Sequence, residues 1–509
     1  MGSTEDLVER IVHNYRWIFV LLFLLPLSFI YDTYFSIRDV VVHWLQSAPR
    51  AHSRKVGKIQ QQVREWNESG RKTKMCTARS GFATMSFRIP TYKKQMTQIR
   101  TDSLIDILEL NINEEYVLVE PMVTMGQLTR YLIPKGYTLP ITPELDDLTV
   151  GGMINGCGVE ASSKKYGLFQ HICISYDLVL SDGSLITAEK ESDNNSSDTS
   201  TLFYGVPWSH GTLGFLVAAK LRIIKCKQFV KLTYTPTDSV TAIQESLKKE
   251  AEDKDNEFVE GIMYSKSTGV IMKGRFSDGG DGDVKVNNIG KWHKKWFYTH
   301  VEDIYNSGKV VTELIPLRDY YHRHSRSIFW ELKEIIPFGN NVLFRWLLGW
   351  LCPPKITLLK LTTPPILRRL YDRKHVIQDM LVPIDALAST VNVFHEEVKI
   401  YPLWLCPFVQ PSCPGMIRQR TGKSIMYVDV GAYGISENPE YNARETTRRL
   451  EEFVRNSKGF QMLYADTYMS RAEFWEMFDS SIYDWLRVKY HCKDAFPDVY
   501  DKVCKAARY

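Results

Sequence analysis

Several features that would mark other classes of protein are missing from this sequence of 509 residues. None of its nine cysteines belongs to a C-x-x-C pair, which argues against a zinc site and against a disulfide scaffold, so we expect no metal and mostly buried, reduced thiols. The net charge is only +5 and no basic run exceeds a short pair, so we expect no nucleic-acid partner. A mean hydropathy of −0.24 excludes many membrane spans.

Apolar residues are nevertheless concentrated near the N-terminus. Residues 17–31 carry no charge, and Asp32 interrupts the run. A membrane-spanning helix needs about 17 to 25 apolar residues, whereas the apolar part of a secretory signal has about 7 to 15. Bulky residues after the run favour a retained anchor, with a cleaved signal and a buried core helix as alternatives. Residues 37–45 predict either a helix at the membrane surface or an ordinary packed helix.

The distribution of basic residues predicts the orientation of this anchor. Two basic residues precede the apolar run and five follow it closely. By the positive-inside rule the body of the protein faces the cytosol. Whether the anchor crosses the bilayer or only enters it stays open.

The remaining chain has a mixed pattern that predicts an α+β fold. Short strand-like runs dominate up to residue 227, and Asp182-Gly183 between two apolar alternations predicts a hairpin. From residue 228 strands alternate with amphipathic helices, which predicts a second domain. Near the C-terminus two helices, at about 445–460 and 470–491, are expected on either side of the segment QMLYADTY.

Two motifs resemble a phosphate-binding loop and a metal site, but each lacks a residue that such a site requires. Gly422-Lys423-Ser424 resembles the end of a phosphate-binding loop, but Ile417 stands where its first glycine should be. His322 and His324 lie two residues apart without a third metal ligand in view, so a structural role is favoured.

The segment TVGGMINGCGVEA, residues 149–161, holds four glycines in eight positions. Glycines remove side chains where backbone N–H groups must approach a pyrophosphate. The part from Gly156 to Ala161 matches the dinucleotide pattern G-x-G-x-x-A, but an acidic turn precedes it instead of a buried strand, so a Rossmann turn is not expected. A glycine-rich packing turn is the alternative.

The surrounding sequence decides between these interpretations. TARSG at 77–81, PELDDLTVGGMINGCG at 143–158, SSKKYGLFQHICISYDLVLSDGS at 162–184 and LFYGVPWSHGTLGFLVAAKLRI at 202–223 follow one another in order. Together they resemble the signatures of the vanillyl-alcohol-oxidase-type FAD-binding family. The resemblance implies a two-subdomain FAD-binding domain and an α+β substrate domain that caps it.

This resemblance assigns approximate domains and a cofactor site. The implied organisation is a membrane anchor at 1–45, an FAD-binding domain at 46–227, a substrate domain at 228–455 and a C-terminal segment at 456–509 that returns to the flavin. The first loop lacks a histidine for covalent attachment, which implies non-covalent FAD. The implied FAD-binding residues are Arg79, Ser80, Gly81, Thr149, Val150, Gly151, Gly152, Met153, Ile154, Asn155, Gly156, Cys157, Gly158, Val159, Glu160, Ala161, Ser162, Ser163, Tyr166, Gly167, Gly211 and Gly214.

A narrower resemblance covers nearly the whole chain. Stretches such as KYGLFQHI, YYHRHSRSIFWE and GFQMLYADTYMSRAEFWEMFD are similar to animal members of this family that reduce the Δ24 side-chain double bond of sterols. This implies an enzyme of the endoplasmic reticulum membrane that consumes NADPH and converts a sterol of the desmosterol type to one of the cholesterol type. The implied partners are the sterol and the lipid bilayer, and a homo-oligomer is not excluded.

The chemistry of an isolated alkene restricts the mechanism. Without a neighbouring carbonyl group no carbanion is stabilised, so protonation at carbon 24 must lead, and reduced flavin would then deliver hydride to the tertiary cation centre at carbon 25. A tyrosine or a carboxylic acid with a raised pKa in an apolar cavity suits this role. Tyr464 is our candidate, with Asp466 and Tyr468 as alternatives, although each could equally be a structural residue.

Other functions are compatible with the same sequence. One is a different enzyme of this fold, either an oxidase that passes electrons to oxygen or a plant-type sterol side-chain reductase or isomerase. The other is a membrane-anchored, non-catalytic sterol-binding protein, which the intact glycine segment disfavours.

Overall fold

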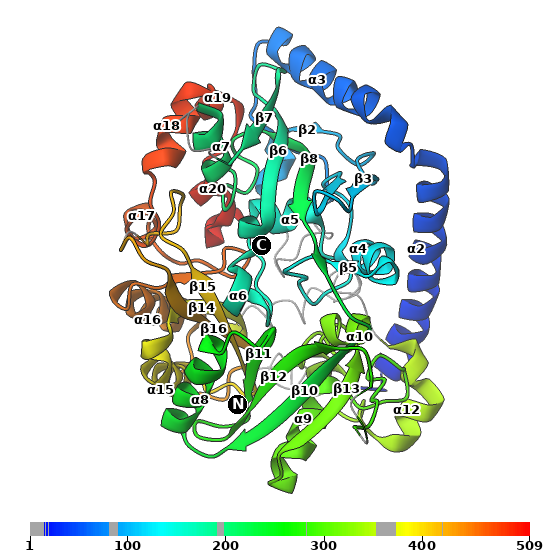
Figure 1. The fold of residues 1–509 in the computed structure, drawn as a ribbon. Coiled ribbons are helices and arrows are strands. Elements are labelled where there is room, and N and C mark those ends of the chain that lie inside the picture. The colour runs from blue at the N-terminus through cyan, green and yellow to red at the C-terminus, as the bar shows by residue number, and fades with distance from the viewer. Residues whose placement is uncertain are drawn as a thin grey trace.

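Two antiparallel sheets form the framework of the protein (Figure 1). The computed structural model describes residues 15, 17, 18, 20–80, 90–190, 198–280, 282, 284–352, 373–419 and 421–508. A five-stranded sheet occupies the upper half of the view and an eight-stranded sheet the lower half, with helices packed around both. The α+β class predicted from the sequence is confirmed.

The five-stranded sheet is built from the first half of the chain. Its strand order is β3 (Ile107–Asn111), β4 (Tyr116–Val119), β8 (Phe215–Arg222), β6 (Cys173–Val179) and β7 (Leu185–Glu189). The hairpin predicted at Asp182-Gly183 is confirmed, because β6 and β7 pair antiparallel and Asp182 Oδ1 accepts hydrogen bonds from the amide and hydroxyl of Ser184. Smaller elements of this half are β1 (Met75–Thr77) with β2 (Thr97–Ile99), β5 (Tyr137–Thr138) with β9 (Ile224–Lys225), α3 (His52–Glu68), α4 (Met125–Leu132), α5 (Val150–Asn155), α6 (Ser163–Tyr166) and α7 (Asp198–Gly205).

The eight-stranded sheet is built from the second half. Its order is β13 (Val311–Pro316), β10 (Phe229–Thr237), β12 (Gly269–Ser277), β11 (Phe258–Met263), β15 (Leu403–Gln410), β16 (Ile425–Ile435), β14 (His375–Pro383) and β17 (Phe460–Gln461). Every residue of β11 is buried, as expected for a central strand covered on both faces. The associated helices are α8 (Val240–Glu252), α9 (Phe297–Ser307), α10 (Leu317–Tyr321), α11 (Glu331–Ile335), α12 (Val342–Leu348), α15 (Leu387–Glu397) and α16 (Ala443–Asn456).

The C-terminal segment packs back against the first half of the chain. The hydroxyl of Tyr483 lies 2.7 Å from that of Thr212, and Arg487 donates a hydrogen bond to the carbonyl oxygen of Thr212 at 3.1 Å. The single helix predicted at 470–491 is wrong. Two helices stand there, because Phe478 is extended and Asp479 Oδ1 accepts a hydrogen bond from the amide of Ser481, which starts a new helix. The helices of this segment are α17 (Arg471–Met477), α18 (Ser481–Lys489), α19 (Cys492–Ala495) and α20 (Val499–Val503).

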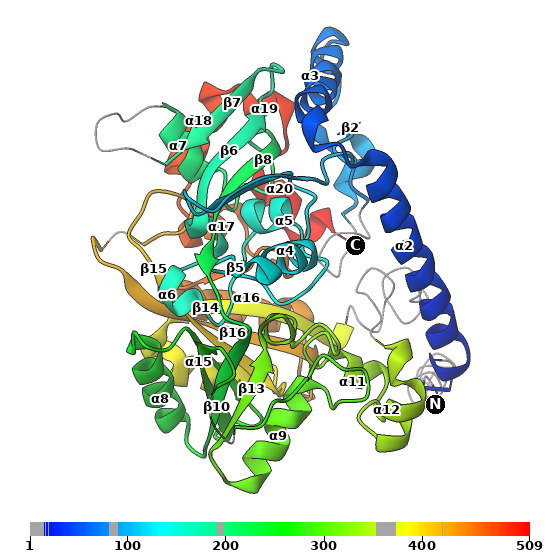
Figure 2. The same cartoon turned by 45° about the vertical axis from the view of Figure 1, so that its right-hand side comes forward.

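The N-terminal helix lies along one side of the body (Figure 2). One π-helical turn at Val20–Leu24 leads into α2 (Leu25–Gln46), and together they form the one helix among the described residues that is long and apolar enough to cross a membrane. The run 17–31 and the segment 37–45 therefore belong to one continuous helix from residue 20 onward. Its first turns reach the short 3-10 turn Gly349–Leu351 that follows α12, because the rings of Phe29 and Trp350 lie 5.2 Å apart.

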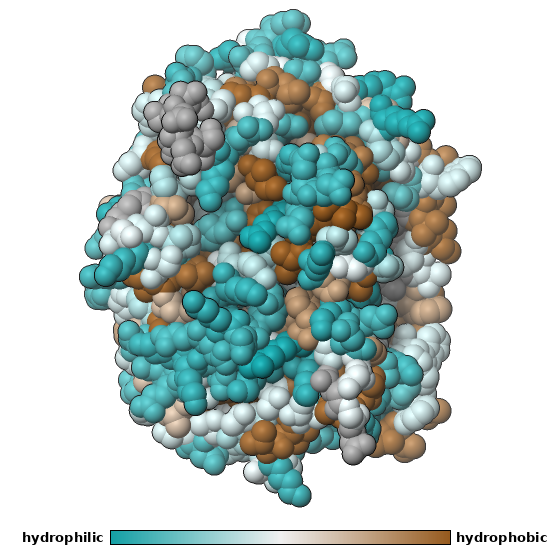
Figure 3. Space-filling view, in the orientation of Figure 1, coloured by the Kyte–Doolittle hydropathy of each residue, from teal (hydrophilic) through white to brown (hydrophobic). Residues whose placement is uncertain are grey.

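Apolar side chains are exposed on both of these elements. On α2 they include Leu27, Ile30, Val40 and Trp44. On α12 and the turn after it, Val342, Leu343, Trp346, Leu347 and Trp350 are exposed. Brown atoms accordingly mark the side of the molecule where α2 runs (Figure 3). We call these exposed residues of α2 and of 342–350 the apolar edge.

A buried ion cluster joins the two halves of the molecule. Arg323 donates hydrogen bonds to Glu160 at 2.6 Å and to Glu260 at 2.7 and 2.8 Å, and all three side chains are fully buried. Glu160 lies near the end of the glycine segment of the first half, whereas Glu260 lies on β11 of the second. Beside them, the amide of Val259 donates to the carbonyl oxygen of Ala161 at 2.9 Å. The cluster fixes the eight-stranded sheet against the glycine segment.

Candidate functional site

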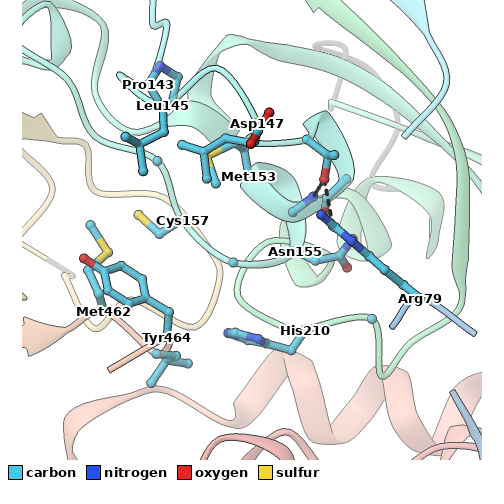
Figure 4. Close-up of a pocket in the computed structure, with 18 of the residues that line it drawn as sticks. Arg79, Pro143, Leu145, Asp147, Met153, Asn155, Cys157, His210, Met462 and Tyr464 are labelled. Carbon is cyan, nitrogen blue, oxygen red and sulfur yellow. Dashed lines mark hydrogen bonds between the residues drawn. The ribbon is translucent and has the colours of Figure 1, made fainter. Parts of the chain in front are cut away.

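A cavity of about 510 Å³ lies at this junction (Figure 4). The glycine segment forms one wall, strands β14, β15 and β16 contribute another, and the C-terminal segment closes it. Figure 4 shows Met462 and Tyr464 on the same side of the cavity as Cys157, with Arg79 and Asn155 on the opposite side. The lining therefore combines residues from 77–216 of the first half with residues 325–331, three strands of the eight-stranded sheet and the C-terminal segment.

The glycine segment begins at Thr149, whose hydroxyl accepts hydrogen bonds from two groups. The amide of Gly152 donates at 3.3 Å, and Arg79 Nη1 donates at 3.0 Å. A Cβ atom at Gly152 would lie 3.2 Å from this hydroxyl and 4.0 Å from Arg79 Nη1. The missing side chain thus keeps the backbone and the guanidinium group accessible from the cavity.

Four cations gather at this end of the cavity, namely Arg79, Lys93, Lys502 and Arg508. Within the described residues their hydrogen bonds go to backbone carbonyl oxygens and to Thr149, none of them is in an ion pair with a carboxylate, and Arg79 Nε has no partner. Burial, together with the neighbouring charges of Lys93 and Arg508, lowers the pKa of Lys502 to about 7. Such a group of unpaired cations is suited to an anionic ligand.

The predicted FAD-binding residues divide into two groups. Arg79, Thr149, Gly151, Gly152, Met153, Asn155 to Val159, Gly211 and Gly214 line the cavity. Val150 and Ile154 of α5, together with Glu160, Ala161, Ser162, Ser163, Tyr166 and Gly167, lie outside the lining, as does the exposed Ser80. Gly81 falls outside the described residues.

The second group contacts protein instead of the cavity. Glu160 binds Arg323, Ser162 Oγ donates to the carbonyl oxygen of Pro140 at 2.8 Å, and the Tyr166 hydroxyl donates to Glu257 at 2.6 Å. Their role in FAD binding stays a prediction. In this structure they connect the glycine segment to the neighbouring elements.

The three predicted proton donors do not all line the same cavity. Tyr464 lines the main cavity and also a smaller depression, whereas Asp466 and Tyr468 line only the smaller one. Asp466 Oδ2 lies 3.0 Å from Lys505 Nζ in an ion pair. The structure thus keeps Tyr464 near the glycine segment and directs the other two elsewhere.

Sequence reasoning missed two carboxyl groups on the cavity wall. Asp379 on β14 and Asp429 on β16 line the cavity, and each is only 1% exposed. The register pairs Asp379 with Gly431, two residues from Asp429, so both side chains lie on the same face of the sheet. Burial raises the pKa of both groups, and the charge of Asp379 raises that of Asp429 further.

Aromatic side chains cover the cavity beside these carboxyl groups. Phe329, Trp404 and Tyr433 all line it, with the ring of Phe329 4.9 Å from Tyr433 and 5.3 Å from Trp404. Ile328 and Phe329 have φ values of 47° and 58°, which bulky residues rarely adopt. Strain of this kind is found where a function requires a particular side-chain position, and here it places Phe329 on the cavity wall.

Comparisons with known proteins agree with this geometry. A family profile described as "FAD binding domain" matches residues 52–189, which include the glycine segment. The chain is 56% identical over 511 residues to a Δ(24)-sterol reductase homologue of Caenorhabditis elegans, covering 99% of this chain and 97% of the relative. It is 53% identical over 502 residues to Δ(24)-sterol reductase of Homo sapiens, covering 99% and 96%.

The similarity extends to plants. Δ(24)-sterol reductase of Pisum sativum is 37% identical over 528 residues, covering 97% of this chain and 92% of the relative. The resemblance inferred from the ordered sequence signatures is confirmed. Because these similarities run over nearly the full length of each chain, this protein belongs to the Δ(24)-sterol reductase family and contains its FAD-binding domain.

Proposed function

We propose that this protein reduces the Δ24 side-chain double bond of sterols, as in the conversion of desmosterol to cholesterol, with non-covalently bound FAD and with NADPH as the reductant. The observation that carries the proposal is the 53% identity, over nearly the full chain, with a protein named Δ(24)-sterol reductase. The cavity adds physical support, because it joins a glycine-lined, cationic end to an aromatic wall.

The residues at the glycine segment suit the cofactor. Arg79 Nε lacks a partner among the described residues, Gly152 leaves space in front of the guanidinium group, and Lys502 is a half-buried lysine without a counter-ion there. A diphosphate would supply the missing negative charge. We therefore assign the FAD diphosphate to Arg79, Thr149, Gly152 and Lys502.

The chemistry divides between cofactor and protein. Bound FAD, once reduced by NADPH, supplies the hydride that the alkene receives at carbon 25. The protein excludes water, orients the sterol side chain against the aromatic wall and delivers a proton to carbon 24. The apolar wall formed by Phe329, Trp404 and Ile377 suits a branched hydrocarbon chain that offers no hydrogen-bonding group.

An absorbance experiment on the purified protein tests this function. We expect a flavin spectrum, its loss under anaerobic conditions when NADPH is added, and its recovery when a Δ24-unsaturated sterol follows. A sterol with a saturated side chain is the matched control and should leave the flavin reduced.

Other outcomes favour the alternatives. If an alcohol reduces the flavin and only oxygen reoxidises it, the protein is an oxidase. Recovery with a plant-type side chain but not with a Δ24 alkene would point to a plant-type reductase. Protein that binds sterol but no flavin after gentle purification would point to a sterol-binding protein, and each of these results contradicts the proposal.

The lowered pKa of Lys502 generates a prediction about pH. With a pKa of about 7, Lys502 is mostly neutral at pH 8 in FAD-free protein. A bound diphosphate favours the ammonium form, so FAD binding at pH 8 should take up roughly one proton, and the uptake should vanish below about pH 6, where the amine is already charged. Calorimetric titration in two buffers of different ionisation enthalpy measures this uptake.

Substitution of Lys502 tests whether this residue takes up the proton when FAD binds. Lys502→Met should abolish the uptake and weaken FAD binding about tenfold to a hundredfold, since a hydrogen bond to a charged group contributes about 1.5–3 kcal/mol. Lys489→Met, at an exposed lysine paired with Asp198, is the control and should change neither quantity. Uptake that persists in Lys502→Met contradicts the assignment.

The apolar N-terminal helix fits a membrane anchor. We propose that it holds the protein on the cytosolic face of the endoplasmic reticulum and that α12 provides a second contact with the bilayer. Support comes from the contact between α2 and Trp350, in the turn after α12, and from the large exposed side chains that α2 and residues 342–350 contribute to the apolar edge. Such a contact would place the protein where a poorly water-soluble sterol is stored.

Flotation with lipid vesicles tests the second contact. A chain without residues 1–45 should still float in part, and replacing Leu343, Trp346, Leu347 and Trp350 by serine should lower its partition coefficient more than about tenfold, since burying each large apolar side chain contributes about 1.5–3 kcal/mol. Replacing the exposed Trp485 and Val488 of α18 is the control. Complete release on removing residues 1–45 contradicts a second contact.

A further inference from the structure

The cavity contains an acid pair whose arrangement the sequence does not reveal. Asp379 and Asp429 come from neighbouring strands, and their side chains emerge on the same face, two positions apart in the register. Gly431, two residues after Asp429, stands opposite Asp379 in the register, and a Cβ atom there would lie 2.8 Å from Asp379 Oδ1 and 2.4 Å from the Tyr433 hydroxyl. Only glycine leaves room for this carboxyl group and this hydroxyl.

The two carboxyl groups differ in their partners. Tyr433 donates its hydroxyl hydrogen to Asp379 Oδ1, whereas Asp379 Oδ2 and both oxygens of Asp429 have no hydrogen-bond partner among the described residues. Asp429 is therefore a buried carboxyl group, directed to a cavity, that the protein leaves without a bond. An unpartnered buried polar group costs stability, so its retention calls for a function.

Among the residues that the structure describes, no cation forms an ion pair with either carboxyl group. Among the described residues, the ionisable groups that act on Asp429 are Asp379, Glu144, Cys157, Tyr433 and Cys406, which is its register partner on β15. Burial and these acidic neighbours raise the pKa of Asp429 well above its usual value. Arg323 binds Glu160 and Glu260 instead. Two carboxyl groups so close in an apolar cavity do not both ionise, and the one without hydrogen bonds retains its proton most firmly.

The cavity also brings Asp429 close to the cofactor segment. Cys157 lies in the glycine segment, and the charges of Asp429 and Asp379 both act on its thiol. The aromatic wall, with Trp404 and Tyr433, adjoins the pair on the same sheet. A hydrocarbon chain between this wall and the glycine segment would thus meet a protonated acid on one side and the cofactor on the other.

We propose that Asp429 is the general acid of this cavity, and that Asp379 and Tyr433 are positioning residues that keep it protonated and oriented. The inference rests on the proposed function. In the step, the O–H bond of Asp429 breaks and the alkene π-electrons form the new C–H bond at carbon 24. Carbon 25 receives hydride equivalents that derive from NADPH, and the resulting Asp429 carboxylate regains its proton from water, so one proton and one hydride are consumed per sterol.

The test compares the two half-reactions of FAD-loaded protein by anaerobic stopped-flow absorbance. In Asp429→Asn, flavin reduction by NADPH should stay within about twofold of wild type, whereas reoxidation by a Δ24 sterol should fall by about a hundredfold or more, the usual contribution of general acid catalysis. Asparagine has the shape of the protonated acid, so the melting temperature should not drop. Tyr433→Phe and Asp379→Asn should shift the pH profile of flavin reoxidation to lower pH, or should slow reoxidation less than Asp429→Asn does.

A second readout does not depend on turnover. The infrared spectrum of FAD-free wild-type protein should contain the carbonyl band of a protonated carboxyl group. The spectrum of FAD-free Asp429→Asn should lack this band. The matched control is Glu451→Gln, because Glu451 is another buried acid whose pKa burial raises to about 7, but it lies outside the cavity lining and accepts a hydrogen bond from the amide of Tyr468. Glu451→Gln should retain both half-reactions.

The failure of this inference is distinguishable from the failure of the proposed function. If wild-type protein is reoxidised by the sterol and Asp429→Asn is reoxidised equally fast, Asp429 is not the acid, and Tyr464→Phe becomes the next variant to examine. If wild-type reduced flavin is not reoxidised by any Δ24 sterol, both the proposed function and the inference are wrong.

Discussion

The position of Arg323 between Glu160 and Glu260 is the constraint on which the cavity depends. Glu160 lies near the end of the glycine segment and Glu260 belongs to a central strand of the large sheet, so one buried guanidinium group holds the two halves together. Removing one partner of a buried ion pair typically costs about 3–5 kcal/mol, because it leaves an uncompensated charge. Trp404, which donates a hydrogen bond to Glu260 at 2.9 Å, connects this cluster to the cavity wall.

Around this junction cations and the buried acid pair occupy different parts of the cavity, although Asp147 also lies near Arg79 at the cationic end. Cations gather near the start of the glycine segment, whereas Asp379, Asp429 and Glu144 face the aromatic wall. The first region suits a diphosphate and the second suits an acid that must keep its proton. Burial lowers the pKa of Lys502 and raises the pKa of Asp429, since it disfavours the charged form of both groups, and like-charged neighbours reinforce each shift.

The parts of this arrangement that are local in sequence could be predicted. The glycine segment and the hairpin at Asp182-Gly183 have patterns that identify them within a few residues. The acid pair could not be found in this way, because Asp379 and Asp429 stand alone in two apolar strands, VIQDML and YVDVGA, and only the pairing of β14 with β16 brings them together.

Contacts between residues far apart in the sequence also explain why sequence reasoning missed other residues of the cavity. Lys502 lies in α20 and Arg508 follows that helix, and nothing near them in the sequence indicates that they line the same cavity as Arg79. Hydrophobic periodicity predicted one helix at 470–491 because Asp479 and Ser481, which stop α17 and start α18, barely alter the apolar pattern. A charged residue isolated in an apolar strand is the signal that would have identified Asp379 and Asp429 as candidates.

A structure of the FAD-loaded protein with a side-chain-saturated sterol in the cavity would test the central claim most directly. The account predicts that a carboxyl oxygen of Asp429 lies within about 3.5 Å of carbon 24, the separation expected for reacting atoms. The sterol side chain should lie between the aromatic wall and the glycine segment. A sterol whose side chain points away from Asp429, or binds outside this cavity, would contradict the account.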